Sequence, residues 1–307
     1  MSPWRNRHDD KSWVPDAWPG DSATVERRLR DELFAEVASS ADMRVSGFDD
    51  VRTTVDLDGA EITHLLIDAT GVKLKMKPGD GATPEPQAKA ETEPAILDRI
   101  PGALRFARIT ADPANIQGYD IRIDATLQNV AFDWARYETP VRADRPATAF
   151  GIADADDPGA PSGAFSVRMR ADDLGPMIES VARPLMKESG MRLRRLDTDV
   201  TANDDQNVTI DAVAAVRWKV FYATVRAHVE LHVARDAIIA VKTVRLSSRN
   251  PLIALALRLM REELREAEGR RLDLNAEAAA DGASRTLRVH DLRVRVAEDI
   301  EVSGRIG

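Results

Sequence analysis

The chain has 307 residues, and its 43 lysines and arginines against 51 aspartates and glutamates leave a formal net charge of −8. Phosphate backbones repel an acidic chain that lacks a strong basic run, so we expect no nucleic-acid partner. The chain contains no cysteine. This excludes disulfides, thiolate catalysis and cysteine-ligated metal centres.

The N-terminal segment 1–21 combines three tryptophans with three prolines and many charges, and it lacks the apolar run of a signal peptide. We interpret it as a flexible tail. The apolar run 252–257 is far shorter than the roughly 20 residues that cross a bilayer. We therefore expect a soluble, cytoplasmic protein, with the inner membrane as a surface that it can contact peripherally.

The first half of the chain starts with an amphipathic helix and continues with alternating strands. Apolar residues recur at helical spacing from Ser22 to about Ser40, after the capping residue Asp21. Apolar and polar residues then alternate over 51–57, 72–76 and 119–134, which predicts half-buried antiparallel strands. In the last of these the phase shifts once between Leu127 and Val130, which indicates a bend. Between the strands, 78–94 has the composition of a disordered loop.

The second half has the same order of elements. A loose, proline-rich segment, 139–164, leads to a helix that Asp172 and Asp173 cap. Long alternating strands are predicted over 208–220 and 221–233, a third helix over 250–268, and closing strands over 287–302. We expect an α+β fold in which a long curved antiparallel sheet wraps on amphipathic helices. A single domain over 22–307 would then consist of two similar halves, 22–138 and 165–307.

Sequence signatures of a nucleophile elbow, a phosphate loop, a dinucleotide turn and a zinc helix are absent. His228, Glu230 and His232 share one face of a predicted strand, but the Cα atoms of the two histidines would lie about 13 Å apart, too far to hold one ion comfortably. We interpret them as a solvated polar face and expect no metal and no cofactor.

Two further groups of residues allow more than one interpretation. His290 and Asp291 lie where the alternation slips, as at a bulge, and with a serine they would form the base and orienting acid of a hydrolytic triad. Arginines accumulate after the second helix, at Arg192, Arg194 and Arg195, and along the third. They suit helix C-termini and ion pairs with neighbouring glutamates. Alternatively, Arg258, Arg261 and Arg265 contact anionic head groups of a membrane.

Three stretches carry a resemblance to a known family. They are IQGYDIRIDATLQNVAFDW at 116–134, FSVRMRADDLGPMIESVARPLM at 165–186 and LRVHDLRVRVAEDIEVSGRIG at 287–307. In these stretches the chain resembles the LmeA-like phospholipid-binding family of the tubular lipid-binding superfamily. The resemblance implies a curved sheet around a long helix that encloses a groove for acyl chains. At least one member of this family is described as a phospholipase.

The sequence therefore predicts a module that binds or transfers a phospholipid or similar amphiphile in an apolar groove, without catalysis. The expected lining lies on the in-phase apolar sides of the predicted strands and helices: Val167, Met169, Ile178, Leu185, Val216, Trp218, Val229, Leu231, Leu255 and Leu259. An esterase or phospholipase that uses His290 and Asp291 is one alternative. A structural or interaction protein whose sheet buries only its own core is the other.

Overall fold

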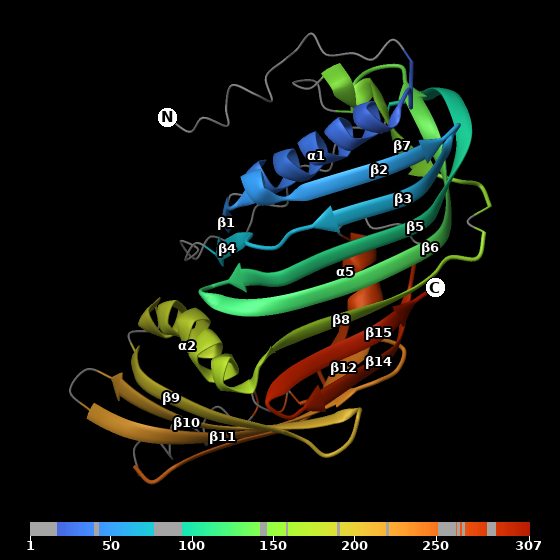
Figure 1. The fold of residues 1–307 in the computed structure, drawn as a ribbon. Helices are drawn as coiled ribbons and strands as arrows, with labels where there is room; N and C mark the ends of the chain where they lie inside the picture. The colour runs from blue at the N-terminus through green and yellow to red at the C-terminus, as the bar shows by residue number, and fades with distance from the viewer. Residues whose placement is uncertain are drawn as a thin grey trace, which may run out of the picture. The chain divides into compact units, whose positions relative to one another are not determined.

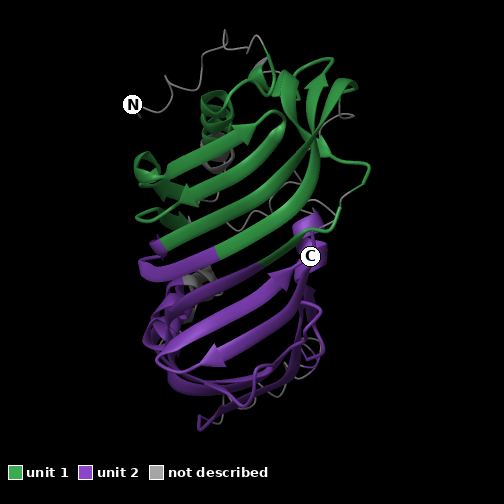
Figure 2. Cartoon of the chain, turned by 45° about the vertical axis from the view of Figure 1, so that its right-hand side comes forward, with its two compact units in different colours: residues 1–111, 125–163 green, residues 112–124, 164–307 purple. Residues whose placement is uncertain are grey.

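The computed structural model describes residues 17–39, 43–76, 94–141, 146–157, 159–188, 191–218, 221–250, 262, 265, 268–280 and 287–307. These residues are mostly β-sheet, with few helices and large antiparallel sheets (Figure 1). The chain forms two compact units. Unit 1 comprises residues 1–111 and 125–163, and unit 2 comprises residues 112–124 and 164–307 (Figure 2).

In its described residues, unit 1 combines one α-helix with a group of paired strands. In chain order its elements are α1 (Ser22–Ser39), β1 (Met43–Ser46), the 3-10 turn Phe48–Asp50, β2 (Arg52–Asp58), β3 (Glu61–Asp68), β4 (Lys73–Met76), most of β5 (Ile96–Ile116) and of β6 (Tyr119–Tyr137), the 3-10 turn Pro146–Ala149 and β7 (Phe150–Asp154). The pairs β1–β4, β2–β3 and β6–β7 are antiparallel, whereas β3 and β5 run parallel.

The helix α1 confirms the predicted first helix. Its N-terminus is capped as the sequence predicts, because the carboxylate Oδ1 of Asp21 accepts a hydrogen bond of 2.8 Å from the backbone N–H of Thr24. Val25 on this helix is fully buried and packs with Val55, Ile62 and Trp134 in the core of unit 1. The indole N–H of Trp134 is satisfied at 2.8 Å by a backbone carbonyl, that of Ala60.

The bend predicted in the strand over 119–134 is confirmed. Asn129 in β6 has a φ of 54°, in the left-handed region that lets the chain shift its alternation between Leu127 and Val130. The segment 139–164, which the sequence predicted to be loose, contains the strand β7, and β7 pairs with β6, Phe150 opposite Arg136. Most of the loop predicted over 78–94 lies outside the described residues.

The described residues of unit 2 include a five-stranded antiparallel sheet, further strands and helices. Its elements are β8 (Ser162–Arg170), α2 (Ala171–Glu188), β9 (Met191–Ala202), β10 (Asn207–Trp218), β11 (Phe221–Val233), β12 (Ile238–Ser248), β13 (Arg271–Asp273), α5 (Leu274–Ala280), β14 (Val289–Val296) and β15 (Asp299–Ile306). The five-stranded sheet has the order β13-β12-β11-β10-β9, and β15 pairs with β14 and neighbours β8.

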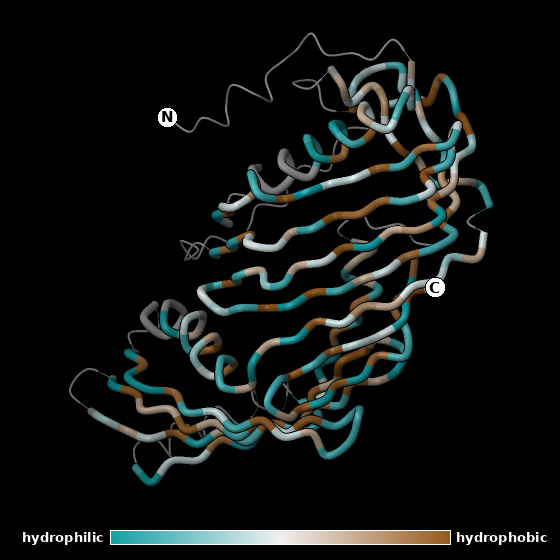
Figure 3. The backbone as a smooth tube through the Cα atoms, in the orientation of Figure 1, coloured by the Kyte–Doolittle hydropathy of each residue, from teal (hydrophilic) through white to brown (hydrophobic). Residues whose placement is uncertain are grey.

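Hydrophilic and hydrophobic residues alternate along the strands of unit 2 (Figure 3). The register pairs Val208 with Leu231 and Ile210 with Val229, so these apolar side chains share one face of β10 and β11. We call it the inner face. Its Val208 packs in a core with Leu292 and Val294 of β14. The opposite face of β10 and β11, the outer face, carries polar and charged residues.

The helix α2 lies against β9 on the inner face. Gly175 of α2 approaches Thr198 of β9 so closely that a Cβ at this position would collide with the threonine hydroxyl oxygen. The backbone N–H of Leu196 also donates a hydrogen bond of 3.2 Å to the carboxylate of Glu179 on α2. Within the described residues, no helix is long and apolar enough to cross a membrane.

Candidate functional site

The predicted lining residues that the structure describes lie on four elements of unit 2. On β8, Val167 and Met169 are half-buried and alternate with the exposed Arg168 and Arg170. On α2, Ile178 is half-buried.

Val216 on β10 and Val229 and Leu231 on β11 fall on the inner face, because the register pairs Val216 with Ala223, Ile210 with Val229 and Val208 with Leu231. Of these, Leu231 packs against the closed core around Val208 and Leu292. Val216 is buried at the other end of β10, beside a pocket.

Several predicted residues cannot be placed. The side chains of Leu185 and Trp218 lie outside the described part of the structure, as do Leu255, Leu259, Arg258 and Arg261. Arg265 is described and exposed. The membrane contact expected on the third helix therefore stays a prediction.

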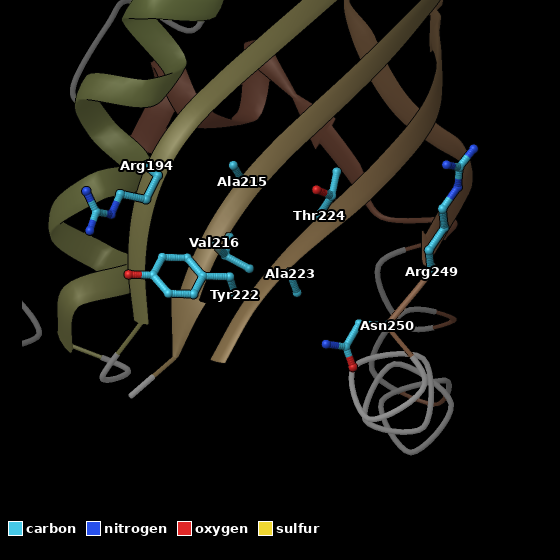
Figure 4. A pocket seen from close by; sticks show the side chains of 8 residues that line it. All are labelled: Arg194, Ala215, Val216, Tyr222, Ala223, Thr224, Arg249 and Asn250. Atoms are coloured by element: carbon cyan, nitrogen blue, oxygen red, sulfur yellow. The ribbon is translucent and has the colours of Figure 1, made fainter. Parts of the chain in front are cut away.

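The pocket beside Val216 has a volume of about 570 Å³ and lies near the end of β10 and the start of β11 (Figure 4). Its lining combines two arginines, small aliphatic residues and three polar side chains: Arg194, Arg249, Ala215, Val216, Ala223, Tyr222, Thr224 and Asn250. Pockets of about 300–1,000 Å³ are typical of small-molecule sites. None of the described residues that line the pocket is acidic, so the formal charge of the lining comes from its two arginines.

Arg194 reaches the pocket because β9 bulges opposite β10. The pairing of the two strands shifts between Ala215 and Val216, where Arg195 opposes Ala215 and Leu193 opposes Val216, so Arg194 is the extra residue. Its guanidinium carbon lies 6.0 Å from the centroid of the Tyr222 ring, and that of Arg217 lies 5.5 Å from the same centroid. Two cation–π contacts thus hold positive charge around an exposed tyrosine.

The sequence indicated only one part of this pocket. Val216 was expected to line a groove, whereas Arg194 was assigned to the end of the second helix. The structure places Arg192, Arg194 and Arg195 on β9 instead, after α2 has ended at Glu188. No sequence pattern marked Tyr222 or Arg249 as a binding residue, because only the register of β10, β11 and β12 brings them to the same pocket as Arg194.

The polar residues His228, Glu230 and His232 share the outer face, as their alternation predicts. The imidazole of His228 contacts two carboxylates, that of Asp211 at 2.8 Å and that of Glu230 at 3.2 Å. His232 contacts instead the side-chain oxygen of Asn207 at 3.0 Å. Among the described residues, no group of three histidine, aspartate or glutamate side chains is arranged to hold a metal ion.

His228 makes the stability of unit 2 depend on pH. The hydrogen bond to Asp211, and then that to Glu230, raises the pKa of His228 above 6.5. The protonated form is thus favoured in the folded state, and this contribution is fully present below about pH 6.5 and is lost as the pH rises through the folded-state pKa. In urea unfolding, His228→Gln should lower the midpoint more at about pH 5.5 than at about pH 9. If His228→Gln lowered the urea midpoint equally at both pH values, or more at alkaline pH, the raised pKa of His228 would be contradicted.

His290 and Asp291 do not form a catalytic pair in this structure. The bulge predicted here is confirmed, because the β14–β15 register shifts between His290 and Arg293, and Asp291 has a φ of 54°. The carboxylate of Asp291 accepts hydrogen bonds of 3.2 and 3.3 Å from Arg293 and also lies near Arg235 and Arg305. These arginines lower the pKa of Asp291. His290 is exposed, and its Nδ1 lies 3.5 Å from the backbone carbonyl of Arg288.

Comparisons of the chain with protein-family models, curated proteins and solved structures found no match.

Proposed function

We propose that unit 2 binds an anionic amphiphile, such as a phospholipid, without catalysis, in the pocket between Arg194 and Arg249. The supporting observation is the composition of that pocket, whose lining joins two arginines and a tyrosine to Ala215 of the outer face and to Val216 and Ala223 of the inner face. An amphiphile needs both surfaces, because its head group is charged while the adjoining chain is apolar.

The arginines of the pocket suit the head group of such a ligand, and its small residues suit the acyl chain. A guanidinium offers several N–H donors in a planar fork, which suits a phosphate or carboxylate head group. Small side chains leave room for an acyl chain to lie against the backbone of the strands. The tubular lipid-binding-like arrangement expected from the family resemblance belongs to the same proposal, as does a location near a membrane.

The hydrolytic alternative is less well supported. Its orienting acid, Asp291, is directed to arginines rather than to His290, and a general base needs a partner that fixes its ring. We therefore propose binding or transfer rather than turnover.

The pocket can be tested with a lipid that stays monomeric in water. Dihexanoyl phosphatidylglycerol should bind the purified chain in native mass spectrometry and calorimetry. Thr224→Trp places a large ring in the pocket lining and should weaken this binding by about tenfold or more, which corresponds to about 1.4 kcal/mol.

The matched control is Thr201→Trp, because Thr201 is also an exposed threonine of the same sheet but lies outside the pocket lining. Its affinity should equal that of the wild type. Equal affinities of all three proteins, or no binding by the wild type, would overturn the proposal. Urea unfolding of both variants checks that neither ring disturbs the fold.

A further inference from the structure

The outer face of β9, β10 and β11 concentrates positive charge at one end. The register sets Arg192 beside Arg217 and Tyr222 in one row, Arg195 beside Ala215 and Thr224 in the next, and Asp197 beside Val213 and Arg226 in the third. Arg194 joins them through its contact with the Tyr222 ring. We call these residues the arginine face: Arg192, Arg194, Arg195, Arg217 and Arg226. Its three rows hold four arginines and one aspartate, and Arg194 adds a fifth arginine, in a chain whose net charge is −8.

This concentration has a cost for folding. Arg192 lies directly across from Arg217 on the neighbouring strand, and like charges in directly opposed positions destabilise a sheet. The one aspartate of the three rows, Asp197, is engaged by Arg195 at 2.8 Å. An external anionic surface would complement this concentration of positive charge.

Apolar groups are exposed among the arginines. Tyr222 is 62% exposed and Val213 is 37% exposed, although both are large hydrophobic residues. A tyrosine places its ring in an apolar layer and its hydroxyl in water, which is the position that the boundary of a bilayer offers. Arginine stems likewise bury their methylene groups while the guanidinium stays among head groups.

We infer that the arginine face is a contact surface for an anionic membrane. This inference goes beyond the proposed pocket, because Arg192 and Arg226 are not part of the pocket lining. The acidic remainder of the chain would be repelled by the same membrane, so the contact has a preferred orientation. It should also weaken with salt, since exposed charges are screened over about 8 Å at physiological ionic strength. The exposed Tyr222 and Val213 favour a membrane over a nucleic acid, because a membrane offers an apolar layer beneath its anionic head groups.

Co-sedimentation tests this surface. We would use large vesicles of phosphatidylcholine with about 30% phosphatidylglycerol, and vesicles of phosphatidylcholine alone. The wild type should bind the anionic vesicles at low salt and the neutral vesicles much less. The double variant Arg192→Glu with Arg226→Glu should lose about tenfold or more of the anionic-vesicle binding.

The matched control is Arg271→Glu with Arg288→Glu, which makes the same charge change at two exposed positions of unit 2 outside the arginine face. It should bind as the wild type does, and unfolding curves should show that both double variants are folded. Equal binding by the two double variants would overturn the inference. So would equal binding to neutral vesicles, no binding by the wild type, or displacement of the protein from vesicles by a short DNA duplex that binds it more tightly.

The vesicle experiment separates this surface from the pocket. The Arg192→Glu, Arg226→Glu variant should still bind dihexanoyl phosphatidylglycerol, whereas Thr224→Trp should lose that lipid and still sediment with anionic vesicles. Loss of both properties in one variant would show that a single site serves both, and would overturn the separate membrane surface.

Discussion

Replacing Trp134 with alanine should lower the free energy of unfolding of unit 1 by about 3–5 kcal/mol. Trp134 is 1% exposed, and its ring makes edge contacts with Phe132 and Trp18 at centroid distances of 4.8 and 5.1 Å. The substitution removes the largest buried side chain of this core and leaves the carbonyl of Ala60 without its indole donor. Urea unfolding followed by circular dichroism measures the loss.

A second variant separates the contribution of the aromatic ring from that of the indole hydrogen bond. Trp134→Phe keeps an aromatic ring against Phe132 and should cost less than Trp134→Ala. A loss of no more than about 0.5 kcal/mol for the alanine variant would fall in the range of an ordinary surface substitution. That result would mean that Trp134 does not centre the core of unit 1.

Leu292→Ala should have the corresponding effect in unit 2, with a loss of about 2–5 kcal/mol. Leu292 on β14 is 1% exposed and packs with Val208 and Val233 of the five-stranded sheet. Alanine would leave a cavity between these strands, because close-packed cores relax only in part. Hydrogen exchange of the β10 and β11 amides, together with urea unfolding, would locate the weakened part.

The control for this variant is Leu272→Ala on β13, where the leucine is 45% exposed. It should change the free energy of unfolding by no more than about 0.5 kcal/mol. If the two leucine variants unfold alike, the core assigned around Leu292 is wrong.

The elements that the sequence predicted well are those with an uninterrupted period. α1, β6, β10, β11, β14 and β15 each carry a long apolar repeat with few breaks, and all are present. The 21-residue strand β5 was not predicted, because Asp98, Arg99, Pro101 and Gly102 interrupt its alternation. β9 was missed for a similar reason, since three of its first five residues are arginines.

The candidate pocket was harder to predict than the strands. A single strand shows which residues share a face, so Val216 could be identified as an apolar inner residue. The pocket forms only through the register of four strands and the bulge opposite Ala215, which bring together Arg194, Tyr222 and Arg249. The spacing of residues along one strand does not encode that register. Once β9 had been missed, its arginines were assigned to the end of a helix.

Photo-crosslinking is the most direct test of amphiphile binding in unit 2. A phosphatidylglycerol with a diazirine in one acyl chain would be incubated with the full chain, irradiated and mapped by peptide mass spectrometry. The account predicts adducts on the peptides that contain Ala215, Val216 and Ala223, and loss of these adducts in Thr224→Trp but not in Thr201→Trp. Adducts confined to unit 1, or adducts on these peptides that persist unchanged in Thr224→Trp, would contradict it.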